Sequence, residues 1–284
     1  MIVAVSGSDG FVGREVCKLL KERGNSIINI DIKNGRDLCD LLTLSQIPLF
    51  DSFIHLANLA YIPRSYSEPE LFYRVNYLTT LNALELCRKY NAHLIYVSSY
   101  IYGPPQYLPV DEEHVINPFN PYAQTKVICE SLCQGYNRDF GTKISIIRPF
   151  NIYGKGQQGK LLIPEIFSQL QEGKKVIKLK SATSRRDYVN VVDVARAICD
   201  CLNICSNYDV YNVCSGKSIS VKEVTEIINR NLKERVIFSF TESDRKIEIE
   251  ESVGSFQKIA RKLNWNPSIT FEDGIIEIIK SINL

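Results

Sequence analysis

The sequence predicts an α/β fold: a doubly wound parallel sheet, followed by a smaller mixed α/β lobe. Short β-branched runs alternate with longer amphipathic stretches through the first half of the chain, which is typical of βαβ units. A glycine-rich loop follows the first run directly and opens the first helical stretch, as in sheets that bind dinucleotides. From residue 151 onward the alternation loosens, and this change predicts the smaller lobe.

The elements of the sheet follow from these patterns in chain order. The predicted strands are Ile2–Ser6, Ser26–Ile30, Ser52–His55, His93–Ser98 and Lys143–Arg148. The amphipathic stretches between them predict helices at Val12–Arg23, Tyr73–Tyr90 and Tyr122–Phe140. Each of these helices is expected to close a right-handed crossover between parallel strands.

The second half of the chain predicts further helices and one strand. They are a helix beginning near Pro164, a strand at VIKLK, and helices at Val191–Leu202, Val221–Asn231, Phe256–Leu263 and Phe271–Ile282. A polar SATSRRD segment separates the strand from the next helix. We therefore expect a Rossmann-type nucleotide-binding domain at residues 1–150, to which the chain returns around residues 189–213, and a substrate lobe at residues 151–284.

Charge and hydropathy exclude several classes of protein. Among 284 residues, Lys and Arg number 34 against 32 Asp and Glu, and this near balance argues against a nucleic-acid or membrane-surface binder. No apolar stretch is long enough to span a membrane. The N-terminus enters a strand pattern at once, without a basic leader, so we expect no secretory signal and a cytoplasmic protein.

The nine cysteines are interpreted as reduced packing residues. An odd number cannot pair completely within one chain, and a chain of this length does not need disulfides. No C-x-x-C knuckle is present, and no histidine lies near the clustered cysteines, so we expect no metal site. The cysteines are Cys17, Cys39, Cys87, Cys129, Cys133, Cys199, Cys201, Cys205 and Cys214.

The glycine-rich loop has the pattern G-x-x-G-x-x-G, formed by Gly7, Gly10 and Gly13. Glycines at this spacing permit a tight turn, close approach of the backbone to a pyrophosphate, and close packing of helix on sheet. Asp31 ends the second predicted strand, where an acid binds the adenosine ribose hydroxyls and repels a 2′-phosphate. This favours NAD over NADP, although Lys33 nearby could accommodate a phosphate.

A second motif, Y-x-x-x-K, places Tyr122 and Lys126 one turn apart on a predicted helix. Asn120 is suited to cap that helix and Pro121 to its first position. A phenol with an ordinary pKa of about 10 is a poor base at neutral pH. A lysine ammonium and a cationic nicotinamide beside it would favour the phenolate, so that Tyr122 could exchange a proton with a sugar hydroxyl.

Together these motifs resemble the extended short-chain dehydrogenase/reductase family, in its nucleotide-sugar epimerase/dehydratase branch, which includes UDP-glucose 4-epimerase-like proteins. The matching segments, in the family's order, are GSDGFVG, Asp31, IHLANLA, VSSYIYG, PYAQTK, RPFNIYG and RRDYVNVVD. The later YNVCSG and LNWNPSITFEDG segments are also similar to the family pattern, so that the resemblance runs from about residue 1 to 280.

The resemblance implies a role for each matched position. The implied cofactor residues are Gly7, Gly10, Phe11, Val12, Gly13, Asp31, Asp37, Leu38, Leu56, Ala57, Asn76, Tyr122, Lys126 and Pro149. The implied catalytic residues are Ser98, Tyr122 and Lys126. The implied substrate residues are Ser98, Ser99, Asn151 and Arg186, the last as a clamp for the pyrophosphate. Ser99 is the alternative to Ser98 as the catalytic hydroxyl, and several of these positions could instead be purely structural.

Three departures from the family pattern bear on which reaction and which substrate contacts the resemblance implies. Ser98 is followed by Ser99 and Tyr100, where dehydratases carry an acidic pair, and this argues against a 4,6-dehydratase. Asn190 stands where a histidine is usual and Cys214 where a glycine is usual, which leaves the substrate contacts there open. Arg245 and its neighbours are the nearest match to a late sugar-contacting arginine of the family.

The resemblance implies an enzyme that binds NAD and a nucleotide sugar. The first interpretation is a 4-epimerase of a UDP-hexose type substrate that acts through a transient 4-keto sugar. The alternative is an NAD(P)H-dependent reductase of a dTDP-, CDP- or GDP-4-keto-6-deoxyhexose, and a third possibility is a dinucleotide-sensing regulator without catalysis. The resemblance also implies a homodimer built from the helices near Tyr73–Tyr90 and Tyr122–Phe140.

Overall fold

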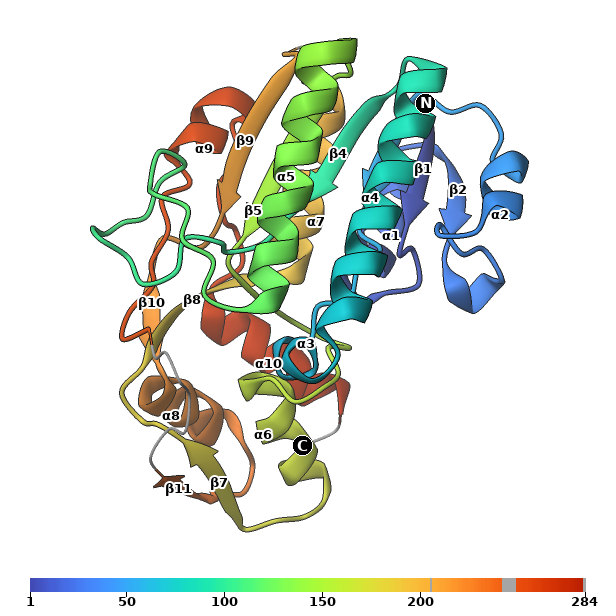
Figure 1. The fold of residues 1–284 in the computed structure, drawn as a ribbon. Coiled ribbons are helices and arrows are strands. Elements are labelled where there is room, and N and C mark those ends of the chain that lie inside the picture. Colours follow the sequence, from blue (N-terminus) through green and yellow to red (C-terminus); the bar gives the residue numbers. More distant parts are fainter. Residues whose placement is uncertain (205, 242–248, 283–284) are drawn as a thin grey trace.

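A six-stranded parallel sheet forms the centre of the computed structural model, which describes residues 1–204, 206–241 and 249–282 (Figure 1). Its strands, in chain order, are β1 (Ile2–Ser6), β2 (Ser26–Ile30), β3 (Ser52–His55), β4 (His93–Val97), β5 (Ile144–Pro149) and β9 (Tyr208–Val213). They lie side by side in the order β2-β1-β3-β4-β5-β9. The order reverses at β1, so a crevice opens beyond the carboxyl ends of β1 and β3, where sheets of this kind bind ligands.

Helices cover both faces of this sheet, as the doubly wound prediction requires. The helices α1 (Phe11–Glu22) and α7 (Val191–Asp200) pack on one face, and α4 (Pro69–Tyr90) and α5 (Pro121–Phe140) on the other (Figure 1). Side chains of β1 alternate between the two layers: Val3 and Val5 join the cluster under α1 and α7, whereas Ala4 joins the cluster under α4 and α5. The sheet is therefore buried on both sides.

Local capping chemistry explains where the two long helices begin. Asn120 accepts a hydrogen bond from the Ala123 N–H at 2.8 Å, and Pro121 occupies the first position of α5. The helix α4 begins at Pro69, four residues before the start predicted from periodicity, because a proline again suits the first turn. The short helices α2 (Leu41–Gln46) and α3 (Ile62–Ser67) were not predicted.

The remaining chain forms a smaller mixed lobe below the sheet (Figure 1). It contains the sheet β10-β8-β6 and the strand pair β11-β7, formed by β6 (Asn151–Tyr153), β7 (Val176–Lys180), β8 (Arg185–Asn190), β10 (Ser218–Ser220) and β11 (Ile237–Thr241). Its helices are α6 (Leu162–Gln171), α8 (Val221–Asn231) and α10 (Phe271–Ser281). The end of the polar SATSRRD segment enters a strand, β8, because β6 and β10 pair with it on both sides.

The chain returns to the main sheet through α7 and β9, and again through α9 (Gln257–Leu263). Trp265, which follows α9, is 1% exposed and joins the hydrophobic cluster that contains Val3 and Val194. Its indole Nε1 donates a hydrogen bond to the Asp193 carbonyl at 3.1 Å. The segment around Trp265, which precedes α10 of the lobe, therefore packs into the core of the main sheet.

The eight described cysteines are free thiols, and all but Cys39 are buried. Burial raises the pKa of Cys17 to about 11, which keeps this thiol protonated at neutral pH. Cys205 lies outside the described residues. Across the described parts of the chain, the side chains form no group of metal ligands. Nor does any helix there have the length and apolar character that crossing a membrane requires.

Two glycines allow the loop after β1 to approach its neighbours closely. A Cβ on Gly13 would lie 2.0 Å from the Gly7 carbonyl oxygen, a distance that no side chain can occupy. Gly7 has a φ of +69°, and a Cβ there would lie 2.9 Å from the Ala57 nitrogen. The loop is thus packed against both the first helix and the segment after β3.

Replacing Gly13 by alanine is expected to destabilise the protein by about 2 kcal/mol or more, because the added methyl group forces the loop away from α1. Gly135→Ala on α5 is the matched control, since a Cβ there meets no atom within 4 Å. That change should stabilise the helix by about 0.5–1 kcal/mol. Urea unfolding of the two variants measures both effects, and equal stabilities would contradict the packing argument.

Candidate active site

The phosphate-binding loop lies at the crevice where the strand order reverses. The Gly10 N–H donates to the Gly7 carbonyl at 3.0 Å and closes a tight turn. Gly10 caps α1 without a side-chain hydrogen bond, so backbone N–H groups of the first helical turn, which includes Phe11 and Val12, are available to an anion. Because Gly7 and Gly13 have no side chains, the loop backbone packs closely on Ala57 and on α1, and this glycine cradle has the tight turn that a dinucleotide pyrophosphate needs.

Asp31 lies directly beside this loop. Its carboxylate is 8% exposed and accepts hydrogen bonds from the backbone N–H groups of Asp9 and Lys33, both at 3.0 Å. The two bonds orient the acid at the position where an adenosine ribose binds in folds of this type. Farther along, Asp37 is exposed and accepts from the Cys39 N–H, whereas the Leu38 side chain is buried in the core.

A buried chain of hydrogen bonds fixes the segment after β3. Ser6 Oγ accepts from the N–H groups of Leu56 and Ala57, at 3.2 and 3.3 Å, so its single proton is donated to His55 Nδ1 at 2.7 Å. His55 Nε2 then donates to Thr80 Oγ1 at 3.2 Å. Burial lowers the pKa of His55 to about 3, and the ring is therefore neutral.

Asn76 completes the support of this segment from α4. Its amide oxygen accepts from the Leu59 N–H at 2.8 Å, and its nitrogen donates to the Leu59 carbonyl and to Thr125 Oγ1. Asn76 thus joins the segment after β3, which contains Leu56 and Ala57, to the helix that carries Tyr122. Sequence reasoning missed Ser6 and His55 as supporting residues, because their pairing depends on β1 and β3 being neighbours.

Tyr122 and Lys126 lie one turn apart near the start of α5, and both are buried. Lys126 Nζ donates a hydrogen bond to the Val97 carbonyl at 2.9 Å and lies 6.0 Å from the centre of the Tyr122 ring. Because Val97 ends β4, this bond joins the catalytic helix to the strand that leads into Ser98 and Ser99.

The two serines after β4 differ in their partners. Ser99 interacts with Tyr122 and lowers the pKa of its phenol, against the effect of burial. Ser98 is 4% exposed, its N–H is bound to the Ile147 carbonyl at 2.7 Å, and its Oγ is buried with no hydrogen-bond partner among the described residues. Asn58 Oδ1, which the sequence analysis did not single out, is also buried without a partner there. The Ser98 hydroxyl therefore has free capacity for a hydrogen bond, which a bound ligand could fill.

Burial controls the electrostatics of the Tyr122–Lys126 pair. It raises the pKa of Tyr122, and the interaction with Ser99 opposes this rise. It lowers the pKa of Lys126 to about 8, with Cys129 and Glu130 opposing the change. The phenol is therefore neutral in the protein alone, and the Lys126 ammonium releases its proton more readily than an exposed lysine does.

Two residues of the lobe were predicted to bind substrate, Asn151 and Arg186. Arg186, on β8, donates from Nη1 to the carbonyls of Arg185 and Ile249, and its charge opposes the rise that burial causes in the pKa of Tyr100. Asn151 Nδ2 donates to the Asp187 carbonyl at 3.0 Å. Both side chains thus bind backbone carbonyls of the lobe, and their predicted contacts with substrate stay a prediction.

The remaining matched positions have structural partners. Pro149 ends β5 and pairs in register with Val213 of β9. Asn190 caps α7 through the Val192 N–H at 2.9 Å, and its Nδ2 is buried without a partner among the described residues. Cys214 is buried in a small cluster with Tyr102 and Phe150. Arg245 lies outside the described residues.

A model of the NAD dependent epimerase/dehydratase family matches residues 3–214. The chain belongs to this family. This confirms the resemblance to extended short-chain dehydrogenases/reductases, and NAD is the cofactor that the glycine cradle and Asp31 fit. The parallel sheet with helices on both faces and a smaller mixed lobe also confirms the predicted fold class.

Individual relatives include both an epimerase and a reductase. A putative UDP-glucose 4-epimerase of Methanocaldococcus jannaschii is 29% identical, over 98% of this chain and 97% of the relative. A GDP-6-deoxy-D-mannose reductase of Pseudomonas aeruginosa is also 29% identical, over 97% and 95% of the two chains. The structure of the UDP-glucose 4-epimerase of Thermus thermophilus in complex with NAD has a TM-score of 0.90 and 26% identity, over 100% and 99%.

Replacing Lys126 by methionine is expected to stabilise the fold at neutral pH, because burial lowers the pKa of this ammonium from 10.5 to about 8. This decrease in the pKa lowers the free energy of unfolding of the wild type by about 3 kcal/mol below about pH 8. As pH rises from about 8 to 10.5, the folded wild type releases this proton while the unfolded chain keeps it. The free energy of unfolding of the wild type therefore rises with pH. Its difference from that of the Lys126→Met variant becomes smaller.

Urea unfolding at about pH 7 and about pH 10 measures the two differences. Lys262→Met, at an exposed position of α9, is the control and should show no such dependence on pH. A Lys126→Met variant that is less stable than the wild type at neutral pH would show that the ammonium contributes more by its contacts than it loses by burial.

Proposed function

We propose that this protein is a 4-epimerase of a nucleotide sugar of the UDP-hexose type. The observation that carries the proposal is the buried, unpartnered Ser98 Oγ beside the Tyr122–Lys126 pair. A hydroxyl of the sugar supplies the missing partner and is then held where a phenol and an ammonium can move its proton. Similarity to a putative UDP-glucose 4-epimerase over nearly the whole length of both chains supports the choice of substrate class.

Each residue of the site has a defined part in this reaction. Ser98 orients the C4 oxygen of the sugar, and Tyr122, once ionised, takes the proton of that hydroxyl as a phenolate. NAD, when bound, would supply a hydride acceptor and donor at C4 and a positive charge that favours this phenolate. The Lys126 ammonium also favours loss of the Tyr122 proton to solvent before the reaction, and Arg186 binds the pyrophosphate of the nucleotide sugar. In the return step, after the keto sugar has rotated in the site, Tyr122 gives the proton back to the C4 oxygen.

A second candidate uses the same three catalytic residues. A reductase of a 4-keto-6-deoxy nucleotide sugar would receive the hydride at C4 once and release an oxidised cofactor, with Tyr122 donating the proton. Similarity to the GDP-6-deoxy-D-mannose reductase supports this alternative. Asp31 favours the epimerase, since its carboxylate is oriented for an unphosphorylated ribose, which suits a retained NAD. A regulator without catalysis is disfavoured because Tyr122 and Lys126 are both present.

Supplying candidate sugars to the purified protein distinguishes these reactions. UDP-glucose, UDP-N-acetylglucosamine and a dTDP-4-keto-6-deoxyhexose are added in turn, while dinucleotide absorbance and sugar products are followed. Interconversion of a UDP-sugar with its C4 epimer, without net redox change, is the expected result. Net consumption of NADH with the keto sugar, and no interconversion, would instead establish the reductase.

Tyr122→Phe is expected to lower turnover by about 10²–10⁴-fold, because the variant has no group to exchange the proton of the sugar hydroxyl. Tyr136→Phe is the matched control on the same helix, since its hydroxyl binds Glu85 at 2.5 Å on α4 and not the site. Dinucleotide binding should survive in both variants. Undiminished turnover in Tyr122→Phe would overturn the catalytic assignment.

The same turnover assay on Ser98→Ala and Ser99→Ala identifies which serine is the catalytic one.

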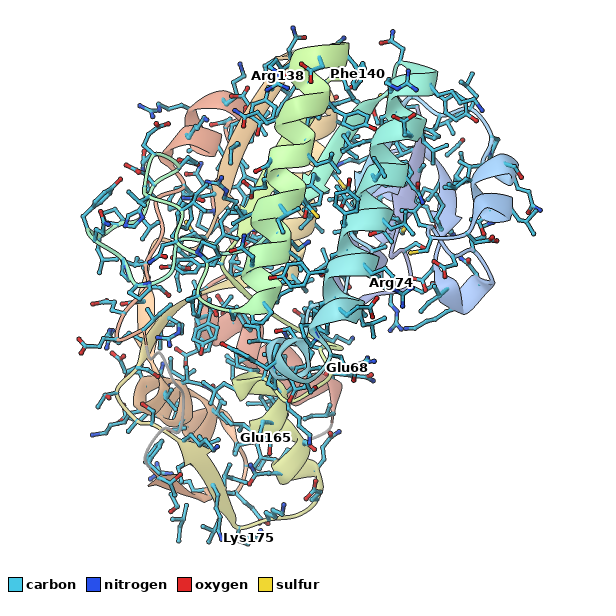
Figure 2. The ribbon with its side chains drawn as sticks, in the orientation of Figure 1. Glu68, Arg74, Arg138, Phe140, Glu165 and Lys175 are labelled. Atoms are coloured by element: carbon cyan, nitrogen blue, oxygen red, sulfur yellow. The ribbon has the colours of Figure 1, made fainter. Side chains whose placement is uncertain are left out.

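We also propose that two copies associate through α4 and α5. These helices lie side by side on one face of the sheet, and Figure 2 shows Arg74, Arg138 and Phe140 on that face. Phe140 is 57% exposed, and Tyr73 and Tyr77 on α4 are 36% and 42% exposed, so the face presents large apolar side chains to a second copy. Sedimentation at micromolar concentration should give a dimer, and a monomer would refute the proposal.

A further inference from the structure

The ammonium of Lys126 is buried without an acid paired to it. Lys126 is 2% exposed, and it forms no ion pair in the parts of the chain that the structure describes. Glu130, one turn farther along α5, is itself bound by Arg148. Nζ of Lys126 has three N–H donors, and one of them binds the Val97 carbonyl. A single carbonyl oxygen does not replace the water that an exposed ammonium binds, so the charge needs a further stabilising contact.

The ring of Tyr96 provides such a contact. Lys126 Nζ lies over this ring, 5.0 Å from its centre, and is closer to it than to the Tyr122 ring at 6.0 Å. A cation at this distance from the face of an aromatic ring is attracted by the ring quadrupole, most strongly where water is excluded. Tyr96 is 1% exposed, so water is excluded here. Burial also raises the pKa of the Tyr96 phenol well above its usual range, which keeps the ring neutral.

The fold holds the Tyr96 ring firmly in this place. Tyr96 lies in the middle of β4, where it pairs in register with His55 of β3 on one side and Ile146 of β5 on the other. Its side chain belongs to the buried cluster under α4 and α5, together with Cys129 and Cys133. The ring is therefore fixed between the central strand and the helix that carries Lys126.

We propose that Tyr96 is a positioning residue, whose ring face keeps the Lys126 side chain charged and in place beside Tyr122. Its attraction opposes the burial that lowers the pKa of Lys126 to about 8, so without the ring this pKa would be lower still. The effect on the charge of Lys126 stands independently of the reaction. Its effect on turnover rests on the proposed function, in which this ammonium favours the Tyr122 phenolate.

The other ionisable groups around Lys126 leave this contribution distinct. The charge of Glu130 favours the ammonium but is shared with Arg148, and burial lowers the pKa of His55 to about 3, so this ring is neutral. Tyr96 and Tyr122 are the aromatic rings over which Nζ lies among the described residues. The groups that face Lys126 are Tyr122, Cys129, Glu130 and Cys133 on α5, Tyr96 on β4, His55 on β3, and Arg148 on β5 through Glu130.

Nuclear magnetic resonance titration of the protein with ¹³C- and ¹⁵N-labelled lysine tests the proposal without substrate. The signal of Lys126 is assigned by its loss in Lys126→Met. In the wild type this signal should titrate at about pH 8. Tyr96→Leu should lower that midpoint by about one pH unit or more, because the ring face is lost. Tyr96→Phe keeps the ring face and should stay within about 0.3 pH unit of the wild type.

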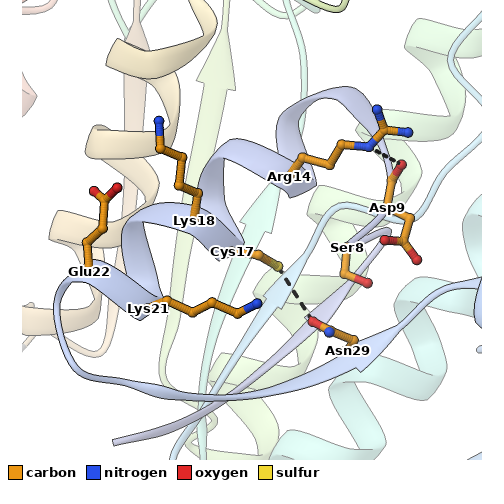
Figure 3. Close-up of a pocket in the computed structure, with 8 residues that line it drawn as sticks. All are labelled: Ser8, Asp9, Arg14, Cys17, Lys18, Lys21, Glu22 and Asn29. Carbon is orange, nitrogen blue, oxygen red and sulfur yellow. Dashed lines mark hydrogen bonds between the residues drawn. The ribbon is translucent and has the colours of Figure 1, made fainter.

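Two controls separate the ring from general effects of substitution. Phe53→Leu, on β3, leaves a cavity in the same buried cluster, but the Phe53 ring contacts Phe50 and His55, so the Lys126 midpoint should not change. The reference signal is that of Lys18, an exposed residue of α1 that lines an open pocket (Figure 3). It is assigned by Lys18→Met and should be the same in every variant.

Fluorinated phenylalanines at position 96 extend the test to rings that fit without a cavity, should Tyr96→Leu fail to fold. Each added fluorine withdraws electrons from the ring face with little change in volume, so the Lys126 midpoint should fall stepwise along the series. A midpoint that stays constant along the series would overturn the proposal. So would a rise of the midpoint in Tyr96→Leu, which would show that the ring acts only by excluding water.

The pH profile of turnover then tests the consequence for the reaction. The ammonium is present below the pKa of Lys126, so the alkaline limb of turnover should move down by about one pH unit in Tyr96→Leu and stay in place in Tyr96→Phe. An alkaline limb that stays in place while the Lys126 midpoint falls would overturn the positioning role. Absence of turnover with every sugar would count against the proposed function, whereas the titration of Lys126 would still decide the role of the ring.

Discussion

The buried ion pair between Arg148 and Glu130 holds α5 to the sheet. Both side chains are almost inaccessible, at 5% and 7%, and the guanidinium of Arg148 binds both oxygens of Glu130. Glu130 follows Lys126 by one turn of α5, as Lys126 follows Tyr122. Removing one partner of such a pair leaves an uncompensated buried charge, which costs about 3–5 kcal/mol. The position of the Tyr122 phenol therefore depends on a buried ion pair two turns farther along the same helix.

The same arginine extends this constraint across the sheet. Its Nη1 donates to the Tyr102 hydroxyl at 2.9 Å, and that hydroxyl donates to Asn212 on β9 at 2.7 Å. A second chain of hydrogen bonds runs from Ser6 through His55 to Thr80 and fixes the segment after β3. Thr80 donates to the Asn76 carbonyl, and Asn76 donates to Thr125 on α5. The second network is therefore joined to the helix that the Arg148–Glu130 pair holds.

Motifs in contiguous sequence were predictable, and contacts between distant segments were not. The glycine loop, Asp31 and the pair Tyr122–Lys126 each depend on local spacing, so the sequence alone predicted the elements on which they lie. The Arg148–Glu130 pair was missed, because it forms only after β5 packs against α5. The strand β8 was not predicted because its charged sequence lacks a strand pattern, and pairing with both β6 and β10 overrides that local preference.

The burial of Trp265 makes its intrinsic fluorescence a probe of how the chain folds. The sequence contains one tryptophan, so the indole emission comes from a single known place. That place lies between α9 and α10, where the ring contacts Phe256 and is hydrogen-bonded to Asp193 at the start of α7. A red shift of this emission therefore signals that the segment around Trp265 has left the core of the main sheet. The fluorophore needed to follow that step is already part of the natural sequence.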